Sequence, residues 1–311
     1  LTHDEGSIVD LNAAYALHLA QEESDPNPQA VADVLLPPYM ITFLERGEKG
    51  RQAAETALAF ASREMAKGQP PVGRNGARIV FAAAAVRLRA PVPRPRRLRD
   101  FLAFEEHASR GGQRQLPKEW YEMPVFYKGN PDAVIGPDEE IPWPSYTQQL
   151  DLELELGIVI GRQGHSIPKE EAMRHVFGYT IFNDVSARDI QGREMNARLG
   201  PAKGKDFCNV FGPCIVTADE VDDMNLRMIA RINGETWCDN NSGTRRYTTA
   251  DVIAWASLEE TIHPGEVLGS GTVGKGSGAE QDRWISPGDL IELEIEGIGV
   301  LRNRVGHPRR D

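Results

Sequence analysis

Residues 151–160 read Asp-Leu-Glu-Leu-Glu-Leu-Gly-Ile-Val-Ile, and this stretch decides the fold class of the larger part of the chain. Successive side chains of a β-strand point to opposite faces. The three leucines therefore share one face of a predicted strand, and Asp151, Glu153 and Glu155 share the other. A period of two over these positions predicts a strand.

The pattern around this stretch is also mostly β. Short apolar alternations separated by Gly, Pro and Asp follow residue 120, and only residues 169–175 and 249–258 have helical spacing. Strands outnumber helices and do not alternate with them regularly, which favours a mixed, mostly antiparallel β-barrel or roll over a doubly wound sheet. The predicted strands are Asp132–Ile141, Leu150–Gly161, Gly212–Val216, Met228–Gly234 and Leu290–Val305.

The first ninety residues are predicted to form a small α/β domain of their own. A strand is expected at Gly6–Asp10, with helices over Leu11–Glu22 and Ala53–Lys67. The segment Ala90–Pro95 cannot continue a helix or a central strand, because proline fixes φ and lacks a backbone donor. We therefore place the domains at residues 1–90 and 91–311. Basic residues in and after this segment are interpreted as a solvated linker face and not as an anion site: Arg94, Arg96, Arg97 and Arg99.

Composition limits the partners of this chain. The formal net charge of -11 argues against nucleic acid, because neutralising phosphates requires a basic surface. The longest apolar stretch is Ile79–Val86, whereas a membrane span needs about 18 apolar residues or more. The cysteines, Cys208, Cys214 and Cys238, are odd in number and lack CxxC spacing, which suits a reducing compartment. We expect a soluble cytoplasmic protein that binds neither nucleic acid nor a membrane.

The acidic face of residues 151–155 is a candidate cation site. Residues two apart on a strand lie about 7 Å apart, so Glu153 and Glu155 can both reach a cation between them. Clustered carboxylates repel one another unless a cation offsets their charge. The alternative is the solvated outer face of an antiparallel strand, and this segment alone leaves both interpretations open.

A second acidic motif carries a family resemblance. Residues 178–189 read Gly-Tyr-Thr-Ile-Phe-Asn-Asp-Val-Ser-Ala-Arg-Asp, which puts Asp184 at a predicted strand end. Together with the Glu-x-Glu at residues 153–155, this motif resembles the fumarylacetoacetate hydrolase family, and further matching blocks extend with gaps from Pro91 to Val305. The chain is similar to the longer, bacterial-type members. The resemblance implies a mixed α/β, predominantly β fold, with a barrel or roll catalytic domain after a small α/β domain, and a homodimer.

The resemblance also implies a divalent metal, Mg²⁺ or alternatively Mn²⁺ or Ca²⁺. Glu153, Glu155 and Asp184 match the family's ligands, and Asp100, seven residues before His107, matches a fourth ligand of the longer members. An all-oxygen set suits a hard cation that keeps waters for substrate to displace. For Asp100 the alternative is an N-cap of the short helix that follows.

His107 is the candidate general base. The pKa of an unperturbed histidine lies near neutrality, and a neighbouring carboxylate would orient the ring. By resemblance, Glu280 is the partner carboxylate and Lys205 a catalytic cation. Shorter members carry a glutamate three residues after the histidine, but that position is Arg110 here, so their local pair is absent. Two acidic neighbours stay open as substitutes, with a helix-face role as their alternative: Glu105 and Glu106.

Several donors resemble the family's substrate contacts. Arg188 and Gln191, with Lys205, match the groups that meet the substrate carboxylate and oxyanion, where donors act on developing negative charge. Three further candidates, each with a structural role as the alternative, are Tyr127, Lys128 and Thr272.

Two glycine-rich segments need an interpretation. Residues 269–274 fit the pattern of a dinucleotide-binding loop, but no helix pattern follows and no strand-helix-strand unit surrounds them. We interpret them as a turn at the rim of the active site. Gly111 and Gly112, just after His107, predict a mobile lid.

The implied reaction is metal-dependent hydrolysis of a carbon–carbon bond in a small 1,3-dioxo acid such as an acylpyruvate or fumarylacetoacetate. The alternative keeps the same metal–enolate site for decarboxylation or tautomerisation of an oxaloacetate-like acid, or for hydration or isomerisation of an unsaturated oxo acid. A third hypothesis is a catalytically silent, metal-binding member. No motif labels the residues that select among small oxo-acid substrates.

Overall fold

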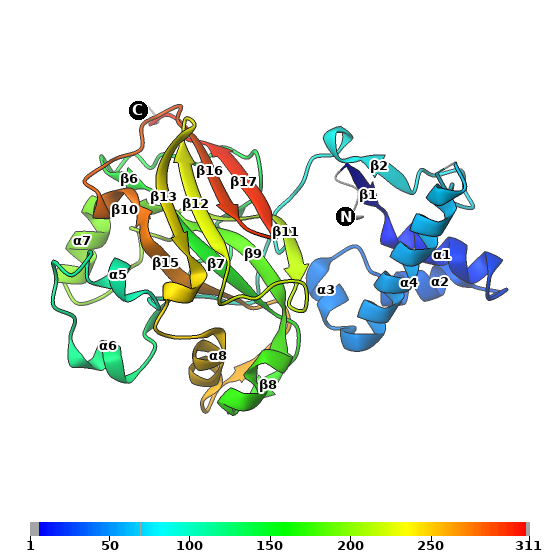
Figure 1. The fold of residues 1–311 in the computed structure, drawn as a ribbon, viewed down its shortest axis with the longest axis horizontal. Coiled ribbons are helices and arrows are strands. Elements are labelled where there is room, and N and C mark those ends of the chain that lie inside the picture. Colours follow the sequence, from blue (N-terminus) through cyan, green and yellow to red (C-terminus); the bar gives the residue numbers. More distant parts are fainter. Residues whose placement is uncertain (1–5, 69, 309–311) are drawn as a thin grey trace. The chain divides into compact units, whose positions relative to one another are not determined.

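The computed structural model describes residues 6–68 and 70–308, and the chain divides into two compact units, Leu1–Arg87 and Leu88–Asp311 (Figure 1). The boundary expected at residue 90 lies three residues later than this division. Ala90 already packs against the second unit, because a Cβ added to Gly136 would lie 2.3 Å from the Ala90 nitrogen.

The first unit combines helices with a two-stranded antiparallel sheet. Ala53, Ala57 and Ala61 are buried on one face of its longest helix, and these small side chains let a neighbouring helix pack closely. The predicted strand and both predicted helices are confirmed, although the second helix begins at Gly47. The elements are β1 (Ser7–Val9), α1 (Leu11–Gln21), α2 (Pro28–Leu35), α3 (Met40–Leu44), α4 (Gly47–Ala66), β2 (Val80–Ala82) and the 3-10 turn η1 (Ala83–Ala85).

A curled, seven-stranded mixed sheet forms the centre of the second unit (Figure 1). Its order is β4-β3-β15-β7-β9-β11-β5, with only the β15–β3 and β11–β5 pairs parallel. The fold is therefore mixed α/β and predominantly β, as expected. The strands are β3 (Leu98–Phe101), β4 (Phe126–Gly129), β5 (Val134–Ile135), β7 (Glu153–Ile160), β9 (Val176–Asp184), β11 (Asn209–Thr217) and β15 (Val267–Ser277).

A second, four-stranded antiparallel sheet, in the order β13-β12-β16-β17, packs against the first. Leu154 and Leu156 share one buried core with Leu293 and Ile295 of that sheet, so the leucine face predicted from the sequence is the core face. The strands are β12 (Arg227–Ile232), β13 (Glu235–Asn241), β16 (Leu290–Ile295) and β17 (Gly299–Arg304), and two short antiparallel pairs are β6 (Leu150–Asp151) with β10 (Ser186–Ala187) and β8 (Gly164–His165) with β14 (Thr261–Ile262).

The second unit carries short helices at the ends of its strands. Figure 1 shows α5, α6 and α7 at the left of the sheets and α8 below the sheets. The helices are α5 (Glu105–Ala108), α6 (Lys118–Glu122), α7 (Arg188–Asn196) and α8 (Thr249–Ser257), and the 3-10 turns are η2 (Lys169–His175), η3 (Ser242–Thr244) and η4 (Gly278–Glu280). Among residues 6–68 and 70–308, none of the helices is both long enough and apolar enough to cross a membrane.

Two local predictions were wrong. Residues 132–141 form a strand only at Val134–Ile135 and an isolated β-bridge between Ile141 and Val305, with turns and irregular backbone in the rest of the segment. Residues 269–274 lie inside the long strand β15 and not in a turn, and their glycines allow neighbouring side chains to approach this strand closely. The helix predicted at residues 169–175 is confirmed, although it is of the 3-10 type.

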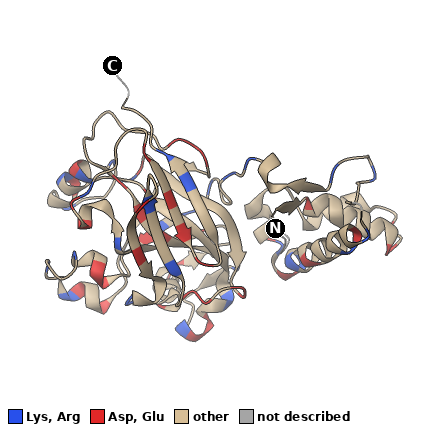
Figure 2. Cartoon of the chain, turned by 45° about the horizontal axis from the view of Figure 1, so that its top comes forward, with Lys and Arg blue, Asp and Glu red and all other residues tan. Residues whose placement is uncertain are grey.

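The interpretation of the basic cluster as a solvated face also fails for one residue. Arg99 is 1% exposed, and its guanidinium binds Glu266 at 2.7 Å and Glu260 at 2.5 Å. Position 99 lies on β3, whose neighbours β4 and β15 cover it. Elsewhere acidic and basic residues are interspersed over helices and sheets (Figure 2).

Candidate active site

Four buried carboxylates from three strands converge in the second unit. Asp100 lies on β3, Glu153 and Glu155 on β7, and Asp184 ends β9. One oxygen from each lies within 4.8 Å of the others. All four are at most 6% exposed, so the alternative of a solvated outer face is wrong, as is the alternative of Asp100 as a helix N-cap.

A glycine on the intervening strand allows this convergence. β15 separates β3 from β7, and Gly269 faces both Asp100 and Gly157 in the strand register. A Cβ at Gly269 would lie 2.3 Å from Asp100 Oδ1 and 2.8 Å from Glu155 Oε2. Only the absence of a side chain there lets the carboxylates meet across the strand.

The donor set fits a hard divalent cation. Asp100 Oδ1 and Asp184 Oδ1 are buried, and neither accepts a hydrogen bond within residues 6–68 and 70–308. Buried polar oxygens without partners are costly, and oxygen-only sites suit Mg²⁺, Mn²⁺ and Ca²⁺. Glu155 is held by hydrogen bonds from the Gly271 amide at 3.0 Å and the Thr272 hydroxyl at 3.2 Å.

The pKa values of the four carboxylates diverge. Burial, with mutual repulsion, raises the pKa of Glu155 and Asp184 well above the usual range, and burial also raises the pKa of Asp100. Burial acts on Glu153 in the same direction, but Arg188 and Lys205 outweigh it and hold the pKa of that carboxyl well below its usual value. A cation bound here would favour the ionised form of all four.

Lys205 is a buried cation beside the cluster. Its ammonium group forms ion pairs with Glu153 and Asp184, and these carboxylates raise its pKa although burial acts in the opposite direction. The hydroxyl of Tyr127 donates to Asp184 Oδ2 at 2.7 Å. Both side chains line the pocket.

His107 and Glu280 form a pair next to the carboxylates. His107 Nδ1 lies 2.7 Å from Glu280 Oε2, while Nε2 lies 3.5 Å from Glu153 Oε1. Glu280 also accepts from the Ser277 hydroxyl at 2.9 Å and the Lys275 amide at 2.9 Å. Burial would raise the pKa of Glu280, but the contact with His107 outweighs it and lowers that pKa.

Arg188 and Gln191 lie together on the first turn of α7. Arg188 Nη2 is 2.7 Å from Glu153 Oε1, and Nη1 donates to Gln191 Oε1 at 3.1 Å. This arrangement places a cation and an amide at the edge of the carboxylate cluster, where they can bind an anionic substrate group.

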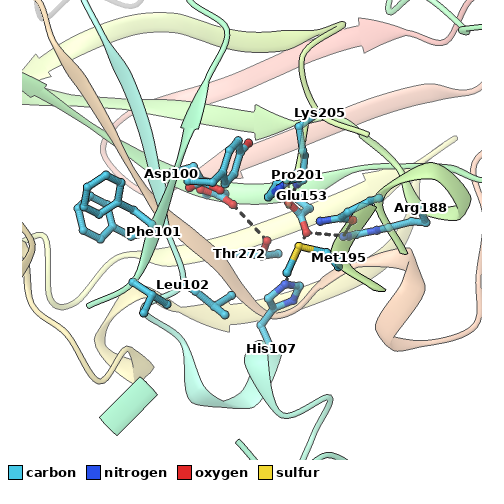
Figure 3. Close-up of a pocket in the computed structure, with 16 residues that line it drawn as sticks. Asp100, Phe101, Leu102, His107, Glu153, Arg188, Met195, Pro201, Lys205 and Thr272 are labelled. Atoms are coloured by element: carbon cyan, nitrogen blue, oxygen red, sulfur yellow. Dashed lines mark hydrogen bonds and ion pairs between the residues drawn. The ribbon is translucent and has the colours of Figure 1, made fainter. Parts of the chain in front are cut away.

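These groups surround a cavity of about 280 Å³. Figure 3 shows Asp100 on the left, Glu153 and Lys205 at the upper right, Arg188 on the right, and His107 projecting toward them from below. A cavity of this size suits a small metabolite. It is lined by Asp100, Phe101, Leu102, His107, Val125, Phe126, Tyr127, Glu153, Glu155, Arg188, Gln191, Met195, Gly200, Pro201, Lys205 and Thr272.

The structure does not bring every predicted residue to the site. Lys128 is exposed and does not line this cavity, because it follows Tyr127 on β4 and adjacent strand residues point to opposite faces. Glu105 accepts from Tyr121 and Glu106 from Asn240, so neither takes the place of Glu280.

Sequence reasoning missed several cavity-lining residues. Leu102, Met195 and Pro201 belong to no chemical motif, and nothing in their residue types could have marked them. Asp151 was grouped with the acidic face but received no role, although its side chain is completely buried.

Comparison with known proteins identifies the family of this unit. The family model described as "Fumarylacetoacetate (FAA) hydrolase C-terminal" matches residues 97–306. The chain belongs to the fumarylacetoacetate hydrolase family. Within this fumarylacetoacetate hydrolase domain lie all four carboxylates, His107 and Glu280.

Several relatives are enzymes that act on small oxo acids. The mitochondrial oxaloacetate tautomerase FAHD2A of Homo sapiens is 34% identical over 276 residues, which cover 88% of this chain and 81% of the relative. The oxaloacetate tautomerase YisK of Bacillus subtilis (strain 168) is 32% identical over 235 residues, covering 73% of this chain and 75% of YisK. Fumarylpyruvate hydrolase from Pseudomonas aeruginosa, solved with Mn²⁺ and pyruvate, is 25% identical with a TM-score of 0.60, covering 68% of this chain and 90% of that one.

Proposed function

We propose that this fumarylacetoacetate hydrolase family member catalyses the keto–enol tautomerisation of a small oxo acid of the oxaloacetate type. The observation that carries the proposal is the His107–Glu280 pair at 2.7 Å beside a four-carboxylate cluster in one small cavity. Similarity to proteins named oxaloacetate tautomerase supports this reaction over the carbon–carbon bond hydrolysis that the sequence pattern first indicated.

The residues of the site divide the work of a proton transfer. Asp100, Glu153, Glu155 and Asp184 would hold a divalent cation, which supplies Lewis-acid polarisation of the substrate's oxo group. In this mechanism the Nδ1–H group of His107 donates a hydrogen bond to the Glu280 carboxylate. Nε2 then carries the lone pair of the ring, and this lone pair faces the cavity.

In the proposed reaction Nε2 of His107 takes a proton from the carbon next to the oxo group. The C–H electron pair becomes the carbon–carbon double bond, the carbon–oxygen π pair moves onto the oxo oxygen, and that oxygen receives the proton from Nε2, directly or through a water molecule, to give the enol. The reverse direction returns the proton from Nε2 to carbon. Arg188 and Gln191 bind a substrate carboxylate, and Lys205 stabilises negative charge that develops on oxygen.

The test is ultraviolet absorbance of the oxaloacetate enol during its conversion, with Mg²⁺ present. Wild-type protein is expected to exceed the metal-catalysed background, and His107→Gln to lose about 100-fold in kcat, because general acid–base catalysis contributes roughly that factor or more. His165→Gln is the control, since this exposed histidine contacts only Thr261 at 3.4 Å within the described residues. Wild-type rates equal to the background would refute the proposal.

Hydrolysis of a carbon–carbon bond is the second candidate. The same His107–Glu280 pair is suited to activating water, and a structural relative is named fumarylpyruvate hydrolase. A panel of acylpyruvates assayed for carboxylic acid release, with oxaloacetate assayed for CO₂, separates hydrolase and decarboxylase activities from tautomerase activity. Acid release that outpaces enol conversion would favour this second reaction.

A further inference from the structure

Asp151 is the first acidic residue of the 151–155 stretch, yet it does not join the carboxylate cluster. It ends β6, which pairs with β10 directly before Arg188. Its side chain is 0% exposed. Between them, its two carboxylate oxygens accept hydrogen bonds from two segments that are remote in the sequence, the start of α7 and the turn η4.

One of these segments is the start of α7. Asp151 Oδ2 accepts from Arg188 Nε at 2.8 Å and lies 2.8 Å from Arg188 Nη2. The same guanidinium reaches Glu153 through Nη2 and Gln191 through Nη1. Asp151 therefore holds one edge of the guanidinium, so that the remaining edge faces the cavity.

The other segment is the 3-10 turn η4. The Gly278 amide donates to Asp151 Oδ1 at 2.8 Å, and the Ala279 amide donates to Oδ2 at 3.1 Å. The next residue of this turn is Glu280, the partner of His107. Gly278 is needed for the approach, because a Cβ there would lie 2.8 Å from Asp151 Oδ1.

We propose that Asp151 is a positioning residue that sets the substrate-binding Arg188 and the Glu280–His107 pair in register with each other. It touches neither His107 nor the cavity, so it acts through these two neighbours. This inference about Asp151 rests on the proposed function, because the reaction that the positioning would serve is the proposed tautomerisation. A carboxylate is required because both oxygens accept from N–H donors, Oδ1 from the Leu152 and Gly278 amides and Oδ2 from Arg188 and the Ala279 amide. Whichever way an asparagine turned, its NH₂ group would oppose two of these donors.

The first variant is Asp151→Asn, measured with oxaloacetate and saturating Mg²⁺. Loss of the Arg188 contact is expected to raise KM about tenfold, and a displaced η4 to lower kcat about tenfold, so that kcat/KM falls about 100-fold. Asp189→Asn is the matched control. Asp189 follows Arg188 on α7, and its carboxylate accepts hydrogen bonds from the Thr147 hydroxyl and the Gln148 amide. The kcat and KM of Asp189→Asn should therefore stay within about twofold of the wild-type values.

Two further backgrounds separate positioning from general destabilisation. In an Arg188→Gln background, Asp151→Asn should still lower kcat but leave KM unchanged, because the KM effect passes through Arg188. In a Glu280→Gln background the pattern should reverse, with KM raised and kcat unchanged. The double variant Arg188→Gln/Asp151→Asn leaves no unpaired buried charge between these two positions, so its kcat can be compared with that of wild type even if either single variant fails to fold.

A binding measurement makes the inference independent of turnover. Oxalate, a planar dianion, is titrated by calorimetry into the Mg²⁺-loaded wild type and variants. Asp151→Asn is expected to weaken its Kd about tenfold, and Asp189→Asn to leave it unchanged. If wild type binds oxalate in this Asp151-dependent way without accelerating enol conversion, the proposed function fails while the positioning role stands. Any of three results would overturn the positioning role of Asp151. These are equal oxalate affinity in wild type and Asp151→Asn, no oxalate binding by wild type, and effects of Asp151→Asn on kcat and KM that are the same in all backgrounds.

Discussion

At the residue scale, charge compensation in the site depends on Lys205. Among the residues that the structure describes, the lysine and arginine side chains in direct contact with the four buried carboxylates are Lys205 and Arg188, and Arg188 is shared with Asp151. Removing one partner of a buried ion pair leaves an uncompensated charge, which costs about 3 kcal/mol or more. A metal ion bound at the cluster would contact two carboxylates, Glu153 and Asp184, with which the Lys205 ammonium group also forms ion pairs.

We expect Lys205→Met to lower the free energy of unfolding of the metal-free protein by about 3 kcal/mol. The same variant should bind Mg²⁺ about tenfold more tightly or better, because a neighbouring positive charge no longer repels the ion. Urea unfolding in EDTA and calorimetric Mg²⁺ titration measure the two effects. Lys128→Met, at an exposed position, is the control, and weaker Mg²⁺ binding by Lys205→Met would show instead that the ammonium group organises the ligands.

At the element scale, β15 is the strand on which the site depends most. It pairs in parallel with β3 and antiparallel with β7, with register shifts after Gly269 and after Thr272. These shifts turn its amide and hydroxyl groups toward Glu155. The glycines of residues 269–274 thus serve close packing within a strand.

Gly269→Ala should therefore displace Asp100 and Glu155. We expect Mg²⁺ affinity and kcat each to fall at least tenfold, because the new methyl group would overlap both carboxylates. Gly192→Ala in α7 is the matched control, since a Cβ there meets nothing within 4 Å. Calorimetry and enol absorbance measure the outcome, and unchanged Mg²⁺ affinity in Gly269→Ala would contradict the assignment of these ligands.

Helix α8 supplies a prediction about stability and pH. Asp251 completes a capping box with Thr248 and binds Lys169 at 2.5 Å. Burial acts to raise the pKa of Asp251, but these hydrogen bonds outweigh it and lower that pKa. A lowered pKa adds stability that is present above the unfolded pKa of about 4 and is lost as pH falls through the folded pKa.

Asp251→Ala should lower the free energy of unfolding at pH 7 by about 1 kcal/mol, and Thr248→Ala should cause a similar loss. Part of the Asp251→Ala deficit should disappear as pH falls from about 4 through the lowered pKa of the folded-state carboxyl, because the carboxyl is then protonated in both the folded and the unfolded state. Urea unfolding at pH 7 and pH 3 compares the proteins. A deficit that grows as pH falls would exclude the ionised carboxylate as its source.

At the scale of the whole molecule, a metal ion bound at the carboxylate cluster would link metal binding to folding. A ligand that binds only the folded state stabilises it by about 2.7 kcal/mol at a concentration of 100 Kd. The cluster lies entirely within the second unit, where its ligands come from three strands of one sheet. A metal ion would thus connect strands that otherwise repel one another through their charges.

Mg²⁺ or Mn²⁺ is expected to raise the melting temperature by several degrees, and EDTA to reverse the change. Asp184→Asn should abolish most of the metal-dependent shift, whereas Glu105→Gln, at an exposed position on α5, should retain it. Differential scanning calorimetry with and without metal measures both. An equal shift in Asp184→Asn would place the ion elsewhere.

Assembly and location stay predictions for this chain. The homodimer implied by the family resemblance is tested by light scattering, which should give twice the chain mass of 34.4 kDa. The cytoplasmic location expected from the sequence stays a prediction, and the human relative FAHD2A is named as mitochondrial.

From the sequence alone, residues 151–160 are predicted as a strand. Strand periodicity is a local property, since the direction of each side chain follows from its position along one strand. The shared acidic face of Glu153 and Glu155 could therefore be predicted from one short motif. The family resemblance added the roles expected of Asp100, Asp184, His107 and Glu280.

Only the tertiary structure decided which atoms meet. His107 and Glu280 are 173 residues apart, and their contact depends on η4 being held by Asp151. The need for Gly269, the outward position of Lys128 and the role of Asp151 all follow from strand order and register. These are set by pairing between distant segments, and no local pattern encodes which residues will lie opposite one another.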